Sequence, residues 1–381
     1  MRVLAMAAPG SGLFLPTIPL AWALRAAGHE VLMANNGESV KTIVRAGFSA
    51  VEVCPERDVF GDFMAASLAI NTTSPGRPLP KKGGLGLFGE EMAEGLLDLA
   101  EDFRPDVVLA TLEQGAAPLI AAALNVPHIE QSIRLAWAGS DPQAQHYRDS
   151  ISEYLEPTRI RLGLPLPSIG QTTVIDIRPP SMGGATATRQ WLMRYVPYNE
   201  SRLIPAWVVT KPMVPRICVT MGSGLQAAAA LVGLKDILIE LADLEVELIL
   251  ALGDIDLSSV GPLPENVRHV GWMPLSAILS SCTAIAHHGG SGTSLTSLAC
   301  GVPQLVIPRD ADQPANAEVL AKRGVGIRCK LTEITPEEIR TGLQRLISES
   351  SFSDSAAAVR DEIATQESPA DIAARIEGMV A

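Results

Sequence analysis

The residues best suited to chemistry in this chain lie in two short polar runs, each of which follows an apolar segment. Residues 287–293 read His-His-Gly-Gly-Ser-Gly-Thr, and residues 309–316 read Arg-Asp-Ala-Asp-Gln-Pro-Ala-Asn. Glycines let a backbone turn tightly and approach a ligand closely. Unpaired N–H groups at the start of a helix, helped by Ser and Thr hydroxyls, bind phosphate oxygens. The first run therefore predicts a turn that holds a phosphate-bearing ligand.

The second run suits a polyhydroxylated ligand. A carboxylate such as Asp312 only accepts hydrogen bonds, whereas the neighbouring amide of Gln313 both donates and accepts, so together they can grip vicinal hydroxyls. Both runs also fit purely structural roles. Asp312 suits the N-cap of a helix with Pro314 in its first turn, and both uses are compatible. Likewise, His287 and His288 can be satisfied histidines at the end of a buried strand.

Alternating strands and helices are needed to position these runs. Apolar segments of strand length alternate with helical patterns, which is typical of parallel α/β units. The first run connects an apolar strand at 283–286 to a helix that ends at Gly301. In the first half of the chain we predict strands at 3–7, 31–34, 106–110 and 127–129, and helices near 16–27, 38–46, 90–103 and 116–124. The second half repeats this scheme from Ile217 onward.

With these segments in place, residues 288–293 and the downstream Asp312-Gln313 resemble the donor signature of the family 1 glycosyltransferases of GT-B fold. The resemblance is strongest to bacterial natural-product glycosyltransferases, the C-glycosyltransferase type among them. Further similar segments lie at 19–31, 195–199, 215–223 and 266–275, so the resemblance covers nearly the whole chain and is missing mainly from about 54–88.

The resemblance implies an α/β GT-B architecture of two Rossmann-like domains that face each other across a cleft. A chain of 381 residues is also too long for one ordinary domain. We predict an acceptor-binding domain at 1–200, a proline-rich linker at 201–215, a donor-binding domain at 216–360, and a C-terminal helix at 361–381 that packs on the first domain.

The family also implies a set of donor-binding residues. His288 and the amides around Ser291 would hold the diphosphate, Asp312 and Gln313 the sugar, and Trp272 would flank the nucleotide base. Without the family, Trp272 is equally an ordinary core aromatic and Ser223 a turn residue. The predicted donor set is Ser223, Trp272, Met273, His288, Gly290, Ser291, Gly292, Thr293, Asp312 and Gln313.

The first domain departs from the family pattern at the acceptor base. Many members carry a His after the first strand, and the matching residue here is Leu13, which cannot take a proton. The usual carboxylate partner of that His corresponds to Thr111. The base can instead lie elsewhere in the chain: Asp141 is our first candidate, and Glu113 and Glu130 come next.

Two other interpretations of the missing His need no replacement base. The acceptor can be a phenol, which ionises readily or attacks through its ring carbon to form a C-glycosidic bond. Alternatively, the chain is a catalytically silent nucleotide-sugar-binding partner of another glycosyltransferase.

For the acceptor we predict a hydrophobic wall. The stretch 54–88 interleaves aromatics with glycines, which suits a mobile loop against a flat ligand, although a surface loop packed on its own side chains would look the same. The predicted acceptor-binding residues are Leu13, Phe60, Phe63, Met64 and Trp137.

Composition limits the function classes. A formal net charge of -12 argues against nucleic-acid binding, which needs a basic surface. Five scattered cysteines imply neither a disulfide framework nor a metal site, and no apolar run suits a secretory signal or a membrane span, so we expect a cytoplasmic protein. The sequence leaves the oligomeric state open, a homodimer included.

We therefore predict an inverting enzyme that needs neither metal nor cofactor. It would move a sugar, a deoxysugar from a TDP or UDP donor, onto a hydrophobic, aromatic polyketide-like aglycone through an O- or C-glycosidic bond.

Overall fold

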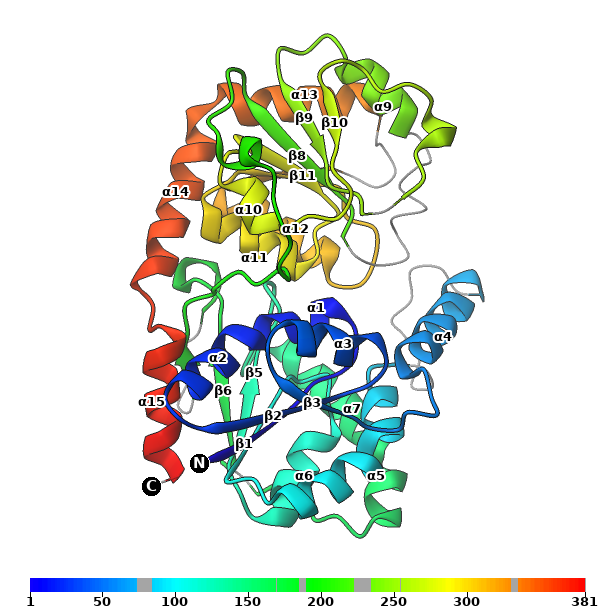
Figure 1. Cartoon of the computed structure of the whole chain (residues 1–381), viewed down its shortest axis with the longest axis vertical. Helices are drawn as coiled ribbons and strands as arrows, with labels where there is room; N and C mark the ends of the chain where they lie inside the picture. The colour runs from blue at the N-terminus through cyan, green and yellow to red at the C-terminus, as the bar shows by residue number, and fades with distance from the viewer. Residues whose placement is uncertain are drawn as a thin grey trace.

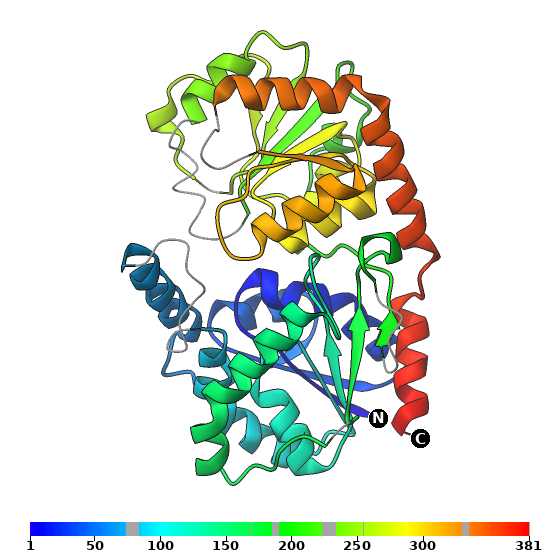
Figure 2. The ribbon, with the colours of Figure 1, turned by 180° about the vertical axis from the view of Figure 1, so that it is seen from behind.

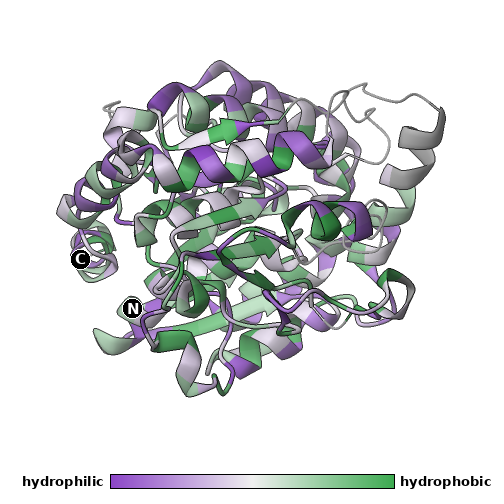
Figure 3. Cartoon of the chain, turned by 90° about the horizontal axis from the view of Figure 1, so that it is seen from above, coloured by the Kyte–Doolittle hydropathy of each residue, from purple (hydrophilic) through white to green (hydrophobic). Residues whose placement is uncertain are grey.

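The structure is a computed structural model that describes residues 1–73, 84–168, 170–184, 190–222, 234–253, 255–329 and 335–380. Two α/β domains stand one above the other (Figure 1). The hydrophobic residues concentrate on the central strands, and hydrophilic residues mark the outer faces of the helices (Figure 3). This distribution is what parallel sheets covered by helices require.

The first domain is built on a parallel sheet of seven strands in the order β3-β2-β1-β4-β5-β6-β7. The strands are β1 (Arg2–Met6), β2 (Glu30–Asn35), β3 (Ser49–Glu52), β4 (Val107–Ala110), β5 (His128–Gln131), β6 (Thr172–Asp176) and β7 (Gln190–Leu192). Its α-helices are α1 (Ser11–Phe14), α2 (Ile18–Ala26), α3 (Glu38–Arg45), α4 (Val59–Thr73), α5 (Gly86–Phe103), α6 (Ala116–Leu124) and α7 (Pro142–Arg161).

The second domain contains a parallel sheet of six strands in the order β10-β9-β8-β11-β12-β13. The strands are β8 (Arg216–Thr220), β9 (Glu247–Leu250), β10 (Val267–His269), β11 (Ala284–His287), β12 (Gln304–Val306) and β13 (Gly326–Arg328). From residue 216 to the end of the chain, the described α-helices are α9 (Leu234–Leu241), α10 (Leu275–Leu279), α11 (Ser291–Cys300), α12 (Gln313–Arg323), α13 (Pro336–Ser348), α14 (Ser350–Thr365) and α15 (Pro369–Val380).

These sheets confirm the predicted fold of two Rossmann-like domains. The predicted strands of the first half lie within one or two residues of β1, β2, β4 and β5. In the second sheet, β11 pairs with β8 and β12 and places His287 opposite Thr220 and Val306. The two polar runs therefore begin at neighbouring strand ends, on one edge of the sheet.

The C-terminal helix returns to the first domain, as predicted. α14 packs on α11, and α15 packs on α2. Figure 2 shows the two helices following one side of the molecule from the second domain to the first. Ile363 of α14, Ile376 of α15, Leu298 of α11 and Leu24 of α2 belong to one hydrophobic cluster. The predicted boundary at 360 falls inside α14, and the domain limits themselves stay predictions.

One expected element is different. The stretch 54–88 was expected to be a long loop, but residues 59–73 form the helix α4. Phe60, Phe63 and Met64 are spaced at i, i+3 and i+4, so they share one face of that helix. A helical signal was therefore present within a segment whose glycines suggested a loop.

Candidate active site

The turn between β11 and α11 is shaped by the buried His287. Its Nδ1 accepts a hydrogen bond of 3.0 Å from the Gly289 N–H, so Nε2 carries the proton and donates to Gln304 Oε1 at 2.9 Å. Burial lowers the pKa of His287 to about 3, and His288 acts in the same direction. His287 is thus a neutral structural histidine that fixes the start of the glycine turn.

His288 occupies the space between two glycines. A Cβ atom on Gly222 would lie 2.7 Å from His288 Cε1, and one on Gly290 would collide with His288 Nε2. Burial lowers the pKa of His288 to about 4, although Asp312 acts in the opposite direction. Within the described residues its Nδ1 has no hydrogen-bond partner. The ring is therefore neutral near pH 7, and a nearby anion would favour its protonation.

Ser291, Asp312 and Asn316 join the two predicted runs in one buried network. Ser291 Oγ donates to Asp312 Oδ2 at 2.6 Å, and Asn316 Nδ2 donates to the same oxygen at 3.1 Å and to the Gly289 carbonyl at 2.8 Å. Burial raises the pKa of Asp312, but the Arg134 guanidinium and the Ser291 hydroxyl outweigh burial and hold it below its usual value. Asp312 is therefore an ionised carboxylate fixed against the turn.

The side chains of Asp312 and Gln313 have different roles at the start of α12. Asp312 occupies the N-cap position of α12, but its side chain makes no capping hydrogen bond. Gln313 instead ties the loop together: its Oε1 accepts from the Arg309 N–H at 2.9 Å and its Nε2 donates to Asp310 Oδ1 at 3.1 Å. The Asp312 carboxylate thus belongs to the network with Ser291, whereas the Gln313 amide holds Arg309 and Asp310 in place before α12.

The first domain reaches this network through Arg134 and Leu135. The Leu135 N–H donates to Ser291 Oγ at 3.0 Å. Arg134 places Nη1 3.4 Å from Asp312 Oδ2 and Nη2 2.7 Å from Glu113 Oε1. Burial disfavours the guanidinium charge, but Glu113 and Asp312 outweigh burial and raise the pKa of Arg134. Sequence reasoning missed Arg134, although it links both predicted carboxylates.

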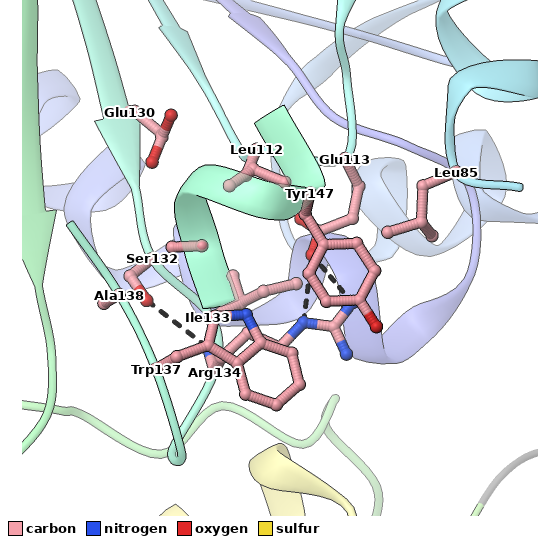
Figure 4. A pocket seen from close by; sticks show the side chains of 11 residues that line it. Leu85, Leu112, Glu113, Glu130, Ser132, Ile133, Arg134, Trp137, Ala138 and Tyr147 are labelled. Atoms are coloured by element: carbon pink, nitrogen blue, oxygen red, sulfur yellow. Dashed lines mark hydrogen bonds and ion pairs between the residues drawn. The ribbon is translucent and has the colours of Figure 1, made fainter. Parts of the chain in front are cut away.

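Glu113 lines a small pocket and has 1% of its surface exposed. Its Oε1 is held by Arg134, whereas Oε2 is buried and has no hydrogen-bond partner in the described part of the chain. Trp137 and Tyr147 stack beside it, with ring centroids 5.6 Å apart and an interplanar angle of 13°. Figure 4 shows Glu113, Arg134, Trp137 and Tyr147 facing one another in this pocket. It measures about 20 Å³, so in this state it admits little more than one water molecule.

Asp141 lies in a different group of charges. Its Oδ2 is 2.8 Å from Arg178 Nη1 and accepts a hydrogen bond of 2.9 Å from the Ala138 N–H. Arg178 also pairs with the buried Asp176 at 2.9 Å. Asp141 is not one of the described residues that line the pocket beside Glu113. The structure therefore does not bring the two predicted bases together, and the role of Asp141 stays a prediction.

The predicted acceptor residues divide into two groups. Trp137 lines the pocket beside Glu113. Leu13, Phe60 and Phe63 instead pack, partly buried, against the core of the first domain, and Phe63 lies 4.6 Å from Phe88 between ring centroids. Met64 is half-buried on the same helix, α4. An acceptor-binding role for these four side chains stays a prediction.

The remaining residues that were predicted to bind the donor belong to the second domain, and their donor-binding role stays a prediction. Arg202 donates to the Trp272 carbonyl at 2.7 Å, and Met273 packs against the cluster that contains Val208 and Ile278. Ser223 lies outside the described residues. Gly292 and Thr293 belong to the first turn of α11, where N–H groups have no partner within the helix.

The described residues contain neither a candidate metal-binding group nor a candidate membrane-spanning helix. Within the described ranges, no three His, Cys, Asp or Glu side chains gather in a group that would hold a metal ion. In the same residues, no helix combines the length and apolar character needed to cross a lipid bilayer.

The whole chain matches known proteins. Residues 22–78 and 80–222 match the N-terminal domain of the family described as erythromycin biosynthesis protein CIII-like, and residues 235–379 match its C-terminal domain. The elloramycin glycosyltransferase of Streptomyces olivaceus is 36% identical, over 99% of this chain and 97% of that protein.

Two solved structures are similar to this chain over nearly its whole length. The glycosyltransferase SnogD of Streptomyces nogalater is 35% identical, with a TM-score of 0.83 over 100% of this chain and 99% of that one. The Streptomyces sp. SF2575 glycosyltransferase SsfS6, complexed with thymidine diphosphate, is 32% identical, with a TM-score of 0.79 over 99% of both chains. With its two sheets, its glycine turn and its Ser291–Asp312 network, this chain belongs to the erythromycin biosynthesis protein CIII-like family and is a natural-product glycosyltransferase of GT-B fold.

Proposed function

We propose that the enzyme transfers a deoxysugar from a TDP-sugar to a hydroxylated, aromatic polyketide-like aglycone, with inversion and without a metal ion. One observation carries this proposal: the glycine turn and Asp312 form a single buried network that faces the acceptor domain at Arg134. The elloramycin glycosyltransferase and the SsfS6 complex with thymidine diphosphate support the substrate classes.

In this proposal the start of α11 binds the diphosphate. The N–H groups of Ser291, Gly292 and Thr293 belong to the first turn, and the first bond within the helix runs from the Ser294 N–H to the Gly290 carbonyl at 3.0 Å. His288 adds a donor whose protonation an anion would favour. These groups meet negative charge as it grows on the departing diphosphate, which lowers the barrier to transfer.

The sugar would bind beside Asp312 and Gln313. Asp312 Oδ2 already accepts from Ser291 and Asn316 and faces Arg134. Sugar hydroxyls that donate to Asp312 compete with Arg134 for the same carboxylate. We therefore propose that the Arg134–Asp312 contact lengthens when the donor enters and that the small pocket beside Glu113 widens with it.

For the acceptor proton we propose Glu113 ahead of Asp141. Glu113 Oε2 is buried, lies in the part of the first domain that meets Asp312 through Arg134, and has no partner in the described chain. The Asp141 carboxylate is instead bound to Arg178 and the Ala138 amide. A phenolic acceptor suits Glu113 because a phenol ionises more readily than an alcohol.

The test is a turnover assay with purified enzyme, TDP-deoxysugars and a panel of phenolic aglycones. The expected result is release of TDP together with one glycosylated product, and stability of that product to acid separates a C-glycoside from an O-glycoside. Binding of the TDP-sugar without turnover across the panel would support the silent-partner alternative and contradict the proposal.

A further inference from the structure

The stretch between β5 and α7, residues 132–141, has no regular secondary structure, yet it carries side chains that contact both halves of the proposed site. Arg134 contacts Glu113 and Asp312. Trp137 lines the pocket beside Glu113 (Figure 4). A segment without helix or strand hydrogen bonds depends on tertiary contacts to keep one conformation. The contacts that hold residues 132–141 therefore also place these two side chains.

One guanidinium ties the end of this stretch to the first sheet. Arg178 lies two residues after β6, and its side chain is 2% exposed. Its Nη2 lies 2.9 Å from Oδ2 of Asp176, the last residue of β6, and its Nη1 lies 2.8 Å from Asp141 Oδ2. Burial disfavours the guanidinium charge, but the two carboxylates outweigh burial and raise the pKa of Arg178. Arg178 is thus a charged link between a strand end and the last residue of the stretch.

Asp141 connects Arg178 to the backbone next to Trp137. Its Oδ2 accepts a hydrogen bond of 2.9 Å from the Ala138 N–H, and its own N–H donates to the Ala138 carbonyl at 3.1 Å. Hydrogen bonds to an ionised carboxylate are among the strong ones in a protein. Residues 138–141 therefore form a tight turn that Arg178 holds through a single carboxylate.

The other side of this turn has room only for a glycine. Gly139 has φ of 57°, and a Cβ atom there would collide with the side-chain amide of Gln190, the first residue of β7. Gln190 Nε2 in turn donates to Asp176 Oδ2 at 2.9 Å, the oxygen that Arg178 also contacts. Arg148 of α7 donates to the Gly139 carbonyl at 2.6 Å. The turn is thus held by residues at the end of β6, at the start of β7 and in α7.

A buried ion pair can serve the fold alone. In that case, loss of the link would lower the amount of folded enzyme without changing the affinity of the folded enzyme for its acceptor. The turn, however, begins one residue after Trp137 and four residues after Arg134. A displaced turn would therefore also displace side chains at the pocket.

We propose that Arg178 is a positioning residue of the transfer reaction. Through Asp141 it holds the turn at 138–141. The place of this turn determines where Trp137 and Arg134 lie at the small pocket. The inference rests on the proposed function, because these two side chains affect transfer only if that pocket receives the acceptor. It gives Asp141 a role that needs an oxygen to accept hydrogen bonds but no basicity.

The first test compares two variants of Asp141 with the wild type, in steady-state kinetics with the donor and phenolic acceptor that the wild type uses fastest. Asp141→Asn keeps an oxygen for the Ala138 N–H, whereas Asp141→Ala removes it. We expect the acceptor KM to rise about tenfold in Asp141→Ala, which corresponds to one lost hydrogen bond, and to stay within about threefold in Asp141→Asn. The KM of the TDP-sugar should stay the same in both. An equal loss of kcat in the two variants, with the acceptor KM unchanged, would identify Asp141 as the base and overturn the proposal.

Arg178 itself is tested with lysine, because removal of its charge would leave Asp176 buried without a cation. Arg178→Lys keeps the charge but offers a single ammonium in place of the planar fork. We expect a several-fold higher acceptor KM and an unchanged KM for the TDP-sugar. A variant whose kcat falls while both KM values equal those of the wild type would show a role in folding alone and would contradict the proposal.

A second pair of variants uses two glycines in the left-handed conformation. Gly139→Ala pushes the Gln190 amide away from Asp176. Gly163, with φ of 63°, has no atom within 4 Å of an added Cβ, so Gly163→Ala is the matched control for backbone strain. We expect the acceptor KM to rise about tenfold in Gly139→Ala and to stay unchanged in Gly163→Ala. Equal acceptor KM values in the two variants would overturn the proposal.

Hydrogen exchange of residues 132–141 in the full chain without substrate separates this inference from the proposed function. Faster exchange of the Ala138 N–H is expected in Asp141→Ala and Gly139→Ala, and the wild-type rate in Asp141→Asn and Gly163→Ala. Unchanged exchange in all four variants would contradict the inference even if the wild type turns over. A wild type that binds TDP-sugar without turnover, but shows the expected exchange rates, would contradict the proposed function and leave the anchoring of the turn in place.

Discussion

Replacement of Arg134 by methionine tests the link between the two domains. Arg134→Met retains an apolar side chain of similar reach but removes the guanidinium. Glu113 then loses its cation in a site where 1% of its surface is exposed. Asp312 loses the contact of 3.4 Å but keeps Ser291 and Asn316. The main cost of the variant should therefore arise at Glu113.

The expected magnitude follows from burial. Removal of one partner from a buried ion pair destabilises a protein by about 3–5 kcal/mol. The Arg134 side chain is 18% exposed, so we expect about 3 kcal/mol for Arg134→Met. Glu113→Gln should cost about 2 kcal/mol, because Arg134 still faces Asp312. In the double variant neither Arg134 nor Glu113 carries a charge, so its cost should be smaller than the sum by roughly 2 kcal/mol.

The assay is urea unfolding of the wild type, the two single variants and the double variant, followed by fluorescence and circular dichroism. Because a chain of two domains can unfold in steps, coincidence of the two signals must be checked before free energies are compared. Arg45→Met is the matched control. Its guanidinium pairs with Glu200 at 3.3 Å but is 54% exposed, so its loss should cost about 1 kcal/mol or less. Additive costs in the cycle, within about 0.5 kcal/mol, would refute the coupling of Arg134 with Glu113.

Three further predictions concern catalysis and pH. Glu113→Gln should lower kcat by about 10²–10⁴ while Asp141→Asn changes it only a few-fold, measured as TDP release; the opposite ranking would assign the base to Asp141. His288→Gln should weaken TDP-sugar binding by about tenfold in calorimetry without a large change in melting temperature, because it removes a diphosphate donor; unchanged affinity would place the diphosphate elsewhere. The folded-state pKa of His128, about 3, lies below the ordinary 6.5, so the unfolded chain takes up the proton first as pH falls. His128 should therefore lower stability below that ordinary value by roughly 2 kcal/mol at about pH 5, in addition to the contributions of His287 and His288, and His128→Gln should reduce the decline in urea melts; identical slopes would disprove it.

The placement of the two polar runs that we propose bind the donor could be predicted from the sequence because its determinants are local. The strand, the glycine turn and the helix from β11 to α11 occupy consecutive residues, and the helix ends at Gly301, which adopts a left-handed conformation with φ of 70°. Neighbouring parallel strands then bring Asp312 to the same sheet edge. Local pattern and sheet topology together were sufficient to predict where these residues lie.

The domain contact could not be predicted in the same way. Arg134 follows β5, its partner Glu113 follows β4, and Asp312 belongs to the other domain, so their meeting depends on how the two domains pack. No spacing in the sequence marks Arg134. The helix α4 was missed for another reason: the nearby glycines favoured a loop, although Phe60, Phe63 and Met64 already followed helical spacing.

The shared core of the C-terminal helices limits how chimeric enzymes can be built. α14 packs on α11, which begins at the donor turn, and α15 packs on α2. Leu298, Ile363 and Ile376 lie in the same cluster as Leu24. A hybrid that exchanges the donor domain for that of a relative must therefore also exchange the contact surface between α15 and α2. Hybrids joined only near residue 215 would combine mismatched halves of one core, and their failures would report on packing rather than on substrate choice.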